Sequence, residues 1–170
     1  TSVTPSYFSY SIDNDRNIIY QDSYSSNLIK INLSGIVLWS YELLGPAVSI
    51  TTDDENNCIV LHIYWSNNLQ VLKLGSTVTL LQTIHVADNV LQPDLLKECY
   101  QIATFRDSIY LDYIDSDGRL CIKKYQGDQS FSYVLDTLLP IKLCADNNGN
   151  IYFLAQHMFT LQPTFAVYKL

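Results

Sequence analysis

The sequence predicts an all-β fold made of four similar repeats, each of about four antiparallel strands. Short segments in which apolar and polar residues alternate, such as Leu28–Leu33, recur along the whole chain, and a period of two is typical of half-buried strands. The 13 tyrosines, with many Ile, Leu and Val residues, favour strands over helices. The second strands of the repeats start at Ile18, Ile59, Ile109 and Ile151, which are 41, 50 and 42 residues apart.

The first repeat, residues 6–44, shows the pattern most clearly. We expect four strands, at 7–12, 18–20, 28–33 and 36–43. The polar and small residues between them, at 13–16, 24–27 and 34–35, predict turns. The segment is therefore interpreted as one antiparallel meander.

The second and third repeats, residues 47–86 and 99–137, follow the same plan. The second is expected to have strands at 47–52, 58–64, 69–74 and 78–85, and the third at 100–104, 109–114, 120–125 and 131–136. Residues 87–98 form an insertion between them. Pro93 and Asp94 suit either a loop or one helical turn there.

The fourth repeat, residues 141–170, has one strand fewer. Strands are expected at 141–145, 151–155 and 165–170. The last of these would have an edge without a neighbouring strand, which folded proteins normally cover. Residues 1–5 are one candidate to cover it, although Pro5 is unfavourable in a strand. Because the sequence starts at Thr1 without Met, we expect a processed product or a piece of a longer chain.

Two segments resemble known propeller repeats. A four-stranded unit every ~40–45 residues has the spacing of a β-propeller blade. Residues 17–43, NIIYQDSYSSNLIKINLSGIVLWSYEL, resemble the repeat of quinoprotein-like (PQQ-type) propellers, in which a strand carrying a Trp follows a Gly, here Trp39 after Gly35. Residues 146–153, DNNGNIYF, resemble NHL-type repeats. The second and third repeats lack the Trp, and the resemblance carries no active site to this chain.

The resemblance implies a β-propeller-like array of about four four-stranded antiparallel blades, as a single domain over residues 1–170. This array is either complete or part of a ring of about six to eight blades. In the second case, missing chain or a second copy of the protein would complete the ring through residues 165–170.

Composition narrows the classes of partner. The formal net charge is −7, whereas nucleic-acid binding requires clustered Lys and Arg. The only adjacent basic pair, Lys123-Lys124, would point to opposite faces of a strand. No stretch approaches ~18 apolar residues, so the sequence predicts no transmembrane helix. We therefore expect neither a nucleic-acid nor a membrane partner, and the sequence does not indicate a compartment.

The cysteines and histidines predict no metal or catalytic site. The cysteines have no C-x-x-C spacing, so we expect small buried side chains in strands, or one disulfide, with Cys99–Cys144 the best pair. His62, His85 and His157 are isolated, and Asp115–Gly118 and Asp146–Asn150 have the residues of tight turns rather than of a calcium loop. We expect no cofactor. The cysteines at issue are Cys58, Cys99, Cys121 and Cys144.

Exposed aromatic residues give the best indication of function. Tyr20, Tyr24, Tyr64 and Trp65 lie at or just after second strands, where they could stack on a sugar or anchor a protein; Trp39 is instead expected to pack between blades. We therefore predict a non-enzymatic binding scaffold that recognises a protein or glycan through loops on one face of a propeller. The alternatives are a hydrolase or lyase with its site in the central channel, and a structural subunit of a larger assembly.

Overall fold

The structure is a computed structural model that describes residues 9–22, 25–90, 99–135, 138–146, 148, 150–157 and 165–169. Within these ranges the chain forms 15 strands and one short 3-10 helix, η1 (Trp65–Asn67). No helix in the described residues has the length and apolar character needed to cross a membrane. The chain divides into two compact units, Thr1–Asp88 and Asn89–Leu170.

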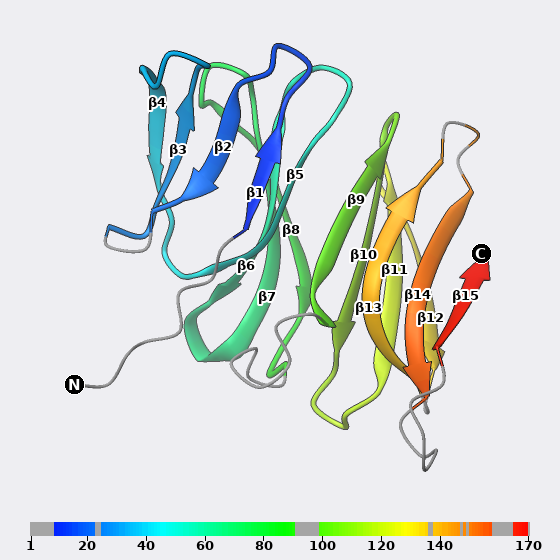
Figure 1. Cartoon of the computed structure of the whole chain (residues 1–170). Helices are drawn as coiled ribbons and strands as arrows, with labels where there is room; N and C mark the ends of the chain where they lie inside the picture. Colours follow the sequence, from blue (N-terminus) through cyan, green and yellow to red (C-terminus); the bar gives the residue numbers. More distant parts are fainter. Residues whose placement is uncertain are drawn as a thin grey trace. The chain divides into compact units, whose positions relative to one another are not determined.

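The first compact unit holds two four-stranded sheets (Figure 1). The first sheet consists of β1 (Tyr10–Ile12), β2 (Ile18–Gln21), β3 (Asn27–Ile31) and β4 (Val37–Glu42). The second consists of β5 (Ala47–Thr52), β6 (Cys58–Tyr64), β7 (Asn68–Leu74) and β8 (Leu80–Ala87). In both sheets the strands pair antiparallel in chain order.

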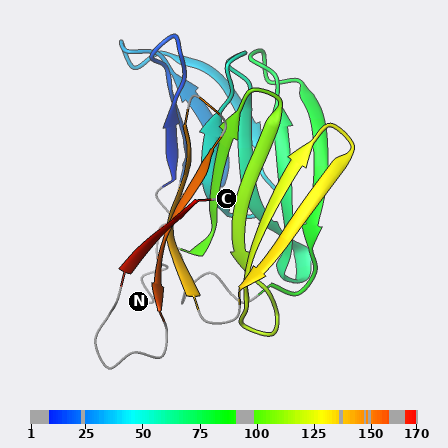
Figure 2. The same cartoon turned by 90° about the vertical axis from the view of Figure 1, so that its right-hand side faces the viewer.

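The second compact unit holds a four-stranded and a three-stranded sheet. The third sheet consists of β9 (Gln101–Phe105), β10 (Ser108–Ile114), β11 (Leu120–Gln126) and β12 (Gln129–Leu135). The fourth consists of β13 (Leu138–Ala145), β14 (Ile151–His157) and β15 (Phe165–Lys169). Figure 2 shows β15 in red beside β14, and no further strand pairs with it in the described part of the chain.

The strand predictions are confirmed, with shifts of a few residues at several strand ends. The predicted strand 78–85 is observed as β8, which starts at Leu80. The delay arises because Val78 lies in a turn with φ 66°, where its N–H bonds to the Gly75 carbonyl. The missing fourth strand of the last sheet is also as predicted within the described residues. The division into one domain with an insertion at 87–98 stays a prediction.

In the second and third sheets the second strand is the most buried one. Every residue of β10 is buried, as are all but one in β6, whereas β8 and β12 at the outer edges are mostly exposed. Strands covered on both faces read as continuous apolar runs rather than alternating ones. His62 in β6 and Asp112 in β10 are therefore unusual polar residues in otherwise apolar runs.

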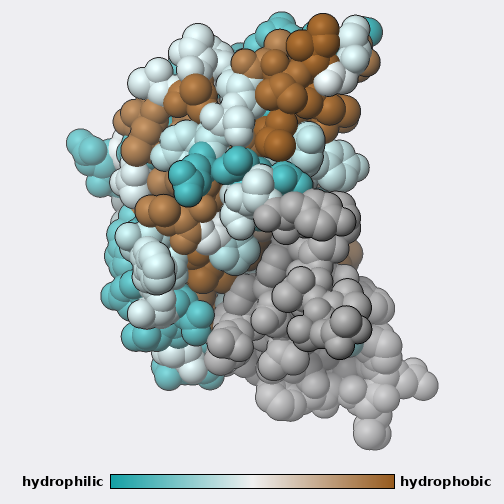
Figure 3. Space-filling view, turned by 90° about the vertical axis from the view of Figure 1, so that its left-hand side faces the viewer, coloured by the Kyte–Doolittle hydropathy of each residue, from teal (hydrophilic) through white to brown (hydrophobic). Residues whose placement is uncertain are grey.

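A shared core joins the first two sheets. Trp39 of β4 is a member of this core, which confirms that it packs between two sheets. The core consists of Ile19, Leu28, Trp39, Leu43, Ala47, Ile50, Cys58, Val60, Leu72 and Leu74. Figure 3, viewed from the side of Figure 1 that carries β4, also shows apolar patches on the surface. The exposed apolar residues of the β3–β4 hairpin are Leu33, Ile36, Val37 and Leu38.

The cysteine prediction is right for three residues and wrong for one. Cys58, Cys99 and Cys121 are buried, but Cys144 is exposed. Cys144 lies on β13 two residues from the exposed Lys142, so both side chains are on the solvent face of that strand. The alternative, a Cys99–Cys144 disulfide, is not formed, and the four cysteines are thiols.

A repeated aspartate turn shapes the hairpins. In three sheets an aspartate directly follows the first strand: Asp13, Asp53 and Asp146. In each case the aspartate Oδ1 accepts the backbone N–H of an Asn four residues later, at 2.8–2.9 Å. The amide of the same Asn donates to Oδ2. Asp115 makes the matching bonds with Arg119, but between β10 and β11. This confirms that the segments starting at Asp115 and Asp146 are turns.

Two of these aspartates pair with lysines, the buried Lys30 and the partly exposed Lys73. Lys30 Nζ of β3 lies 2.6 Å from Asp13 Oδ2, and Lys73 Nζ of β7 lies 2.8 Å from Asp53 Oδ2. Burial alone would raise the pKa of each carboxyl, but the bonds from the lysine and the asparagine outweigh it and hold the pKa below its usual value. The turns of the first compact unit are therefore anchored to the third strand of their own sheet.

Candidate functional site

The predicted aromatic residues Tyr64 and Trp65 come together at the β6–β7 hairpin. Tyr64 pairs with Asn68 across the hairpin, and the Asn68 N–H donates to the Trp65 carbonyl. Ser66 and Asn67 between them have φ of 59° and 61°, as the two central residues of a type I′ turn require. We call residues 64–68 the aromatic turn. Its tight connection fixes the backbone that carries both rings.

The indole of Trp65 is the most exposed large aromatic side chain among the described residues, at 68%. Its ring meets that of Tyr64 edge to face, with centroids 6.2 Å apart, and Tyr64 meets the ring of His62 in the same way at 6.3 Å. Gly45 supports the turn from behind, since a Cβ there would lie 1.9 Å from the Ile63 carbonyl oxygen. The aromatic turn is thus a tight hairpin on which Trp65 is largely open to solvent.

The other predicted binding residues do not join it. Tyr20 lies in β2, paired with Tyr10 and Ile29 of the first sheet. Tyr24 lies outside the described residues. Among the histidines, His85 is exposed and its Nε2 lies 3.3 Å from Asp88 Oδ1.

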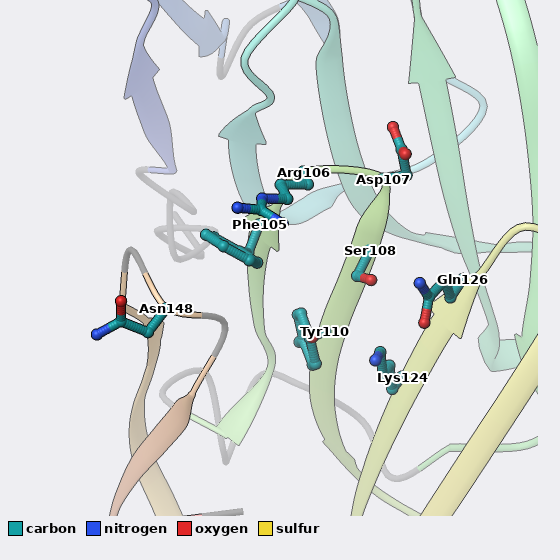
Figure 4. Close-up of a pocket in the computed structure, with 8 residues that line it drawn as sticks. All are labelled: Phe105, Arg106, Asp107, Ser108, Tyr110, Lys124, Gln126 and Asn148. Atoms are coloured by element: carbon teal, nitrogen blue, oxygen red, sulfur yellow. The ribbon is translucent and has the colours of Figure 1, made fainter.

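A cavity of about 390 Å³ opens in the second compact unit, near the β9–β10 turn (Figure 4). Register places its residues together: Phe105 pairs with Ser108, Tyr110 with Lys124, and Ser108 with Gln126. These side chains therefore share one face of the third sheet. The lining consists of Phe105, Arg106, Asp107, Ser108, Tyr110, Lys124, Gln126 and Asn148. The cavity volume of about 390 Å³ is within the size range of small-ligand sites.

Asn148 reaches the cavity from the β13–β14 turn of the neighbouring sheet. Its backbone N–H donates to Asp146 Oδ1 at 2.8 Å, so the aspartate turn holds this residue in place. In Figure 4 the Asp107 carboxylate points away from the other lining side chains. The other lining residues are two cations, two aromatic residues and three neutral polar residues, and in Figure 4 the Asn148 side chain lies apart from the rest.

Sequence reasoning missed this cavity. The sequence does contain two relevant patterns, far apart in the chain. Residues 106–108 are typical of a turn, and the adjacent Lys123 and Lys124 are expected to point to opposite faces of a strand. The structure confirms the second point, since Lys124 lies over the Tyr110 ring and Lys123 over the Tyr113 ring. Asn148 reaches the cavity because the third and fourth sheets pack together. No local sequence pattern predicts this packing.

Three buried side chains have a polar atom without a hydrogen-bond partner in the described part of the chain: Trp39 Nε1, both ring nitrogens of His62, and Asp112 Oδ2. Burial lowers the pKa of His62 to about 4, although the nearby Gln70 side chain acts in the opposite direction. Asp112 Oδ1 accepts the Gln101 N–H at 2.7 Å. Burial raises the pKa of Asp112 to about 7. No set of three ligating side chains suitable for a metal occurs among the residues described.

No family model and no curated protein matches the sequence, but solved structures match its fold. A Bacteroides caccae protein of unknown function superposes with a TM-score of 0.63 and 12% identity, over 95% of this chain and 59% of that one. A catalytically inactive virginiamycin B lyase from Staphylococcus aureus, with quinupristin, gives 0.58 and 11%, over 99% and 57%. A gluconolactonase from Xanthomonas campestris gives 0.56 and 8%, over 93% and 60%.

These similarities establish a propeller-like, all-β fold, as the sequence predicts. At 8–12% identity they carry the fold alone. The specific resemblance to quinoprotein-like or NHL-type repeats stays a prediction. The chain spans 57–60% of the length of the structures it matches.

Proposed function

We propose that the chain is a non-enzymatic binding scaffold that recognises a glycan through the aromatic turn. The observation that carries the proposal is Trp65, a large apolar ring that is 68% exposed on a tight hairpin. An exposed indole leaves a large apolar surface in water, and burying that surface against a ligand would contribute much of the binding energy.

The polar residues around Trp65 favour a sugar over an apolar protein surface. Ser66 is exposed, and Asn67 and Asn68 are partly exposed beside it. A sugar ring offers an apolar C–H face for the indole and hydroxyls that bond with Ser and Asn side chains. A protein that uses Trp65 as an anchor is the alternative ligand.

The test measures calorimetric binding of glucose-, galactose- and mannose-based oligosaccharides to wild type, Trp65→Ala and Leu81→Ala. Leu81 is an exposed apolar residue on β8 of the same compact unit and serves as the matched control. We expect Trp65→Ala to weaken binding about tenfold or more and Leu81→Ala to leave it unchanged. Binding that survives Trp65→Ala would remove the aromatic turn as the site, and no binding by any sugar would favour the protein alternative.

An enzyme is the second candidate, because two of the matched folds belong to a lyase and a lactonase. The sequence-based enzyme hypothesis places a His and Asp pair in the central channel, and the cavity at the β9–β10 turn, with one carboxylate and no histidine, does not supply such a pair. The exposed aromatic turn therefore makes binding the preferred proposal. Turnover of a lactone or of a cyclic peptide ester by the purified chain would reverse this preference.

We also propose that a further strand pairs with β15, supplied by additional chain or by a second copy. The first three sheets have four strands and the fourth has three in its described residues. The four sheets of this chain cover 57–60% of the length of the similar structures. A ring of the full length of those structures would therefore hold about seven such sheets. Light scattering coupled to size exclusion distinguishes a second copy, with a mass near twice 19.4 kDa, from a monomer.

A further inference from the structure

We propose that the cavity at the β9–β10 turn binds a small ligand through an oxyanion group, a carboxylate or a phosphate. This site is separate in residues and in compact unit from the aromatic turn and does not depend on it. We call it the cationic pocket. It is lined by the cations Arg106 and Lys124, by one carboxylate, Asp107, and by neutral side chains.

The first argument is charge. Arg106 and Lys124 have no carboxylate within ion-pair distance among the described residues, and both line the same cavity. The chain carries a formal net charge of −7, so acidic partners are abundant elsewhere. With two cations and one carboxylate, Asp107, the lining of this concave site has a positive balance, and the field of the cations attracts anions.

The second argument is how the cations are held. The Arg106 guanidinium lies 5.0 Å from the centroid of the Phe105 ring, and Lys124 Nζ lies 5.5 Å from that of Tyr110. Cation–π contacts of this kind position a charge without neutralising it. The guanidinium keeps its fork of N–H donors for a planar oxyanion, and the ammonium keeps its three donors.

The third argument is the backbone. In the first, second and fourth sheets an aspartate turn links the first two strands, but the third sheet has the two-residue turn Arg106-Asp107 at this place. Arg106 adopts φ 51°, a conformation that favours Gly or Asn over Arg. The third sheet thus lacks the aspartate turn at this place and carries the turn Arg106-Asp107 instead, with Arg106 in the left-handed region.

Neutral donors complete the site. The Ser108 hydroxyl and the Gln126 and Asn148 amides line the same cavity, and each can donate to an oxyanion or to hydroxyls next to it. A volume of about 390 Å³ suits a ligand of monosaccharide size. The ligand class is therefore a small polar molecule with one carboxylate or phosphate.

The experiment titrates the ¹⁵N-labelled chain with four probes: glucose, glucuronate, glucose 6-phosphate and inorganic phosphate. Glucuronate and glucose differ only in the carboxylate, and the two phosphates separate the sugar from the anion. We expect glucuronate or a phosphate to shift the amide signals of residues 105–110 and 124–126 saturably, glucose to shift none of them, and salt to weaken binding. Equal shifts with glucose, or no shift with any anion, would overturn the proposal.

Variants give an independent arm. Arg106→Gln and Lys124→Gln should each weaken anion binding about tenfold or more, because each removes a charge-assisted hydrogen bond. Lys123→Gln is the matched control: it lies on the same strand, also over a tyrosine ring, but on the other face. Thermal melts verify that all three fold. Equal loss in Lys123→Gln and Lys124→Gln would show that net charge alone, rather than the pocket, holds the anion.

Discussion

Replacing Lys30 by Met should destabilise the chain far more than the same change at Lys73. The Lys30 and Asp13 side chains are 5% and 0% exposed, whereas the Lys73 side chain is 25% exposed and that of its partner Asp53 is 5% exposed. Removing one partner of a buried pair leaves an unpaired charge and costs about 3–5 kcal/mol, while a pair near the surface is worth about 1 kcal/mol. We therefore expect a loss of about 3 kcal/mol for Lys30→Met and about 1–2 kcal/mol for Lys73→Met.

The assay is urea unfolding followed by circular dichroism, with the slope of the transition compared between variants. In thermal melts, 3 kcal/mol corresponds to a decrease of about 6–12 °C for a chain of this size. The double variant Asp13→Asn/Lys30→Met should recover most of the loss, because no buried charge remains. The reasoning is refuted if Lys30→Met loses no more than Lys73→Met.

The same pair predicts a pH dependence. The pKa of Asp13 is held below its usual value in the folded chain, so its contribution to stability is present above the pKa of the unfolded chain and is lost as the pH falls through the folded one. The stability gap between wild type and Lys30→Met should therefore be complete at pH 7 and shrink below about pH 4. A gap that is independent of pH would mean that Lys30 stabilises by packing rather than by charge.

Two further changes test other parts of the fold. The stability of Asp112→Asn relative to wild type should increase as the pH rises from about 4 to about 7. Burial raises the pKa of Asp112 to about 7, so in this range the folded wild-type chain keeps a proton that the unfolded chain releases. Urea unfolding at pH 5 and pH 8 measures the stability difference between the two chains, and a difference that narrows with rising pH would contradict the prediction. Gly45→Ala should cost about 2 kcal/mol or more, because its Cβ would lie 1.9 Å from the Ile63 carbonyl oxygen. The control Gly75→Ala, with its nearest contact at 3.5 Å, should cost much less in the same unfolding assay.

The order of the strands was predictable because short local segments of the sequence determine where each strand and turn lies. Alternating runs such as Leu28–Leu33 and turn residues such as Ser34-Gly35 specify strands and hairpins through side-chain period and backbone preference. The buried run of β10 was also recognisable from Ile109, Tyr110 and Leu111, although it does not alternate.

The sites were less predictable because they depend on packing. Trp39 and Trp65 both follow apolar residues in the sequence, yet one joins the core between two sheets and the other is exposed on a turn. The sequence predicts the packing of Trp39, whereas the degree to which Trp65 is exposed is seen only in the structure. Arg106 and Lys124 are 18 positions apart in the chain and share a cavity only through the register of three strands and the turn that carries Asn148.

The central proposal is that Trp65 contacts a glycan, and ¹⁹F NMR of the chain labelled with 5-fluorotryptophan tests it directly. The sequence contains two tryptophans, so the spectrum has two resonances, which Trp65→Phe assigns. On titration with the same oligosaccharides, the Trp65 resonance should shift saturably while that of the buried Trp39 stays in place. A Trp65 resonance that does not move up to about 10 mM sugar, where even weak carbohydrate binding is visible, would contradict the proposal.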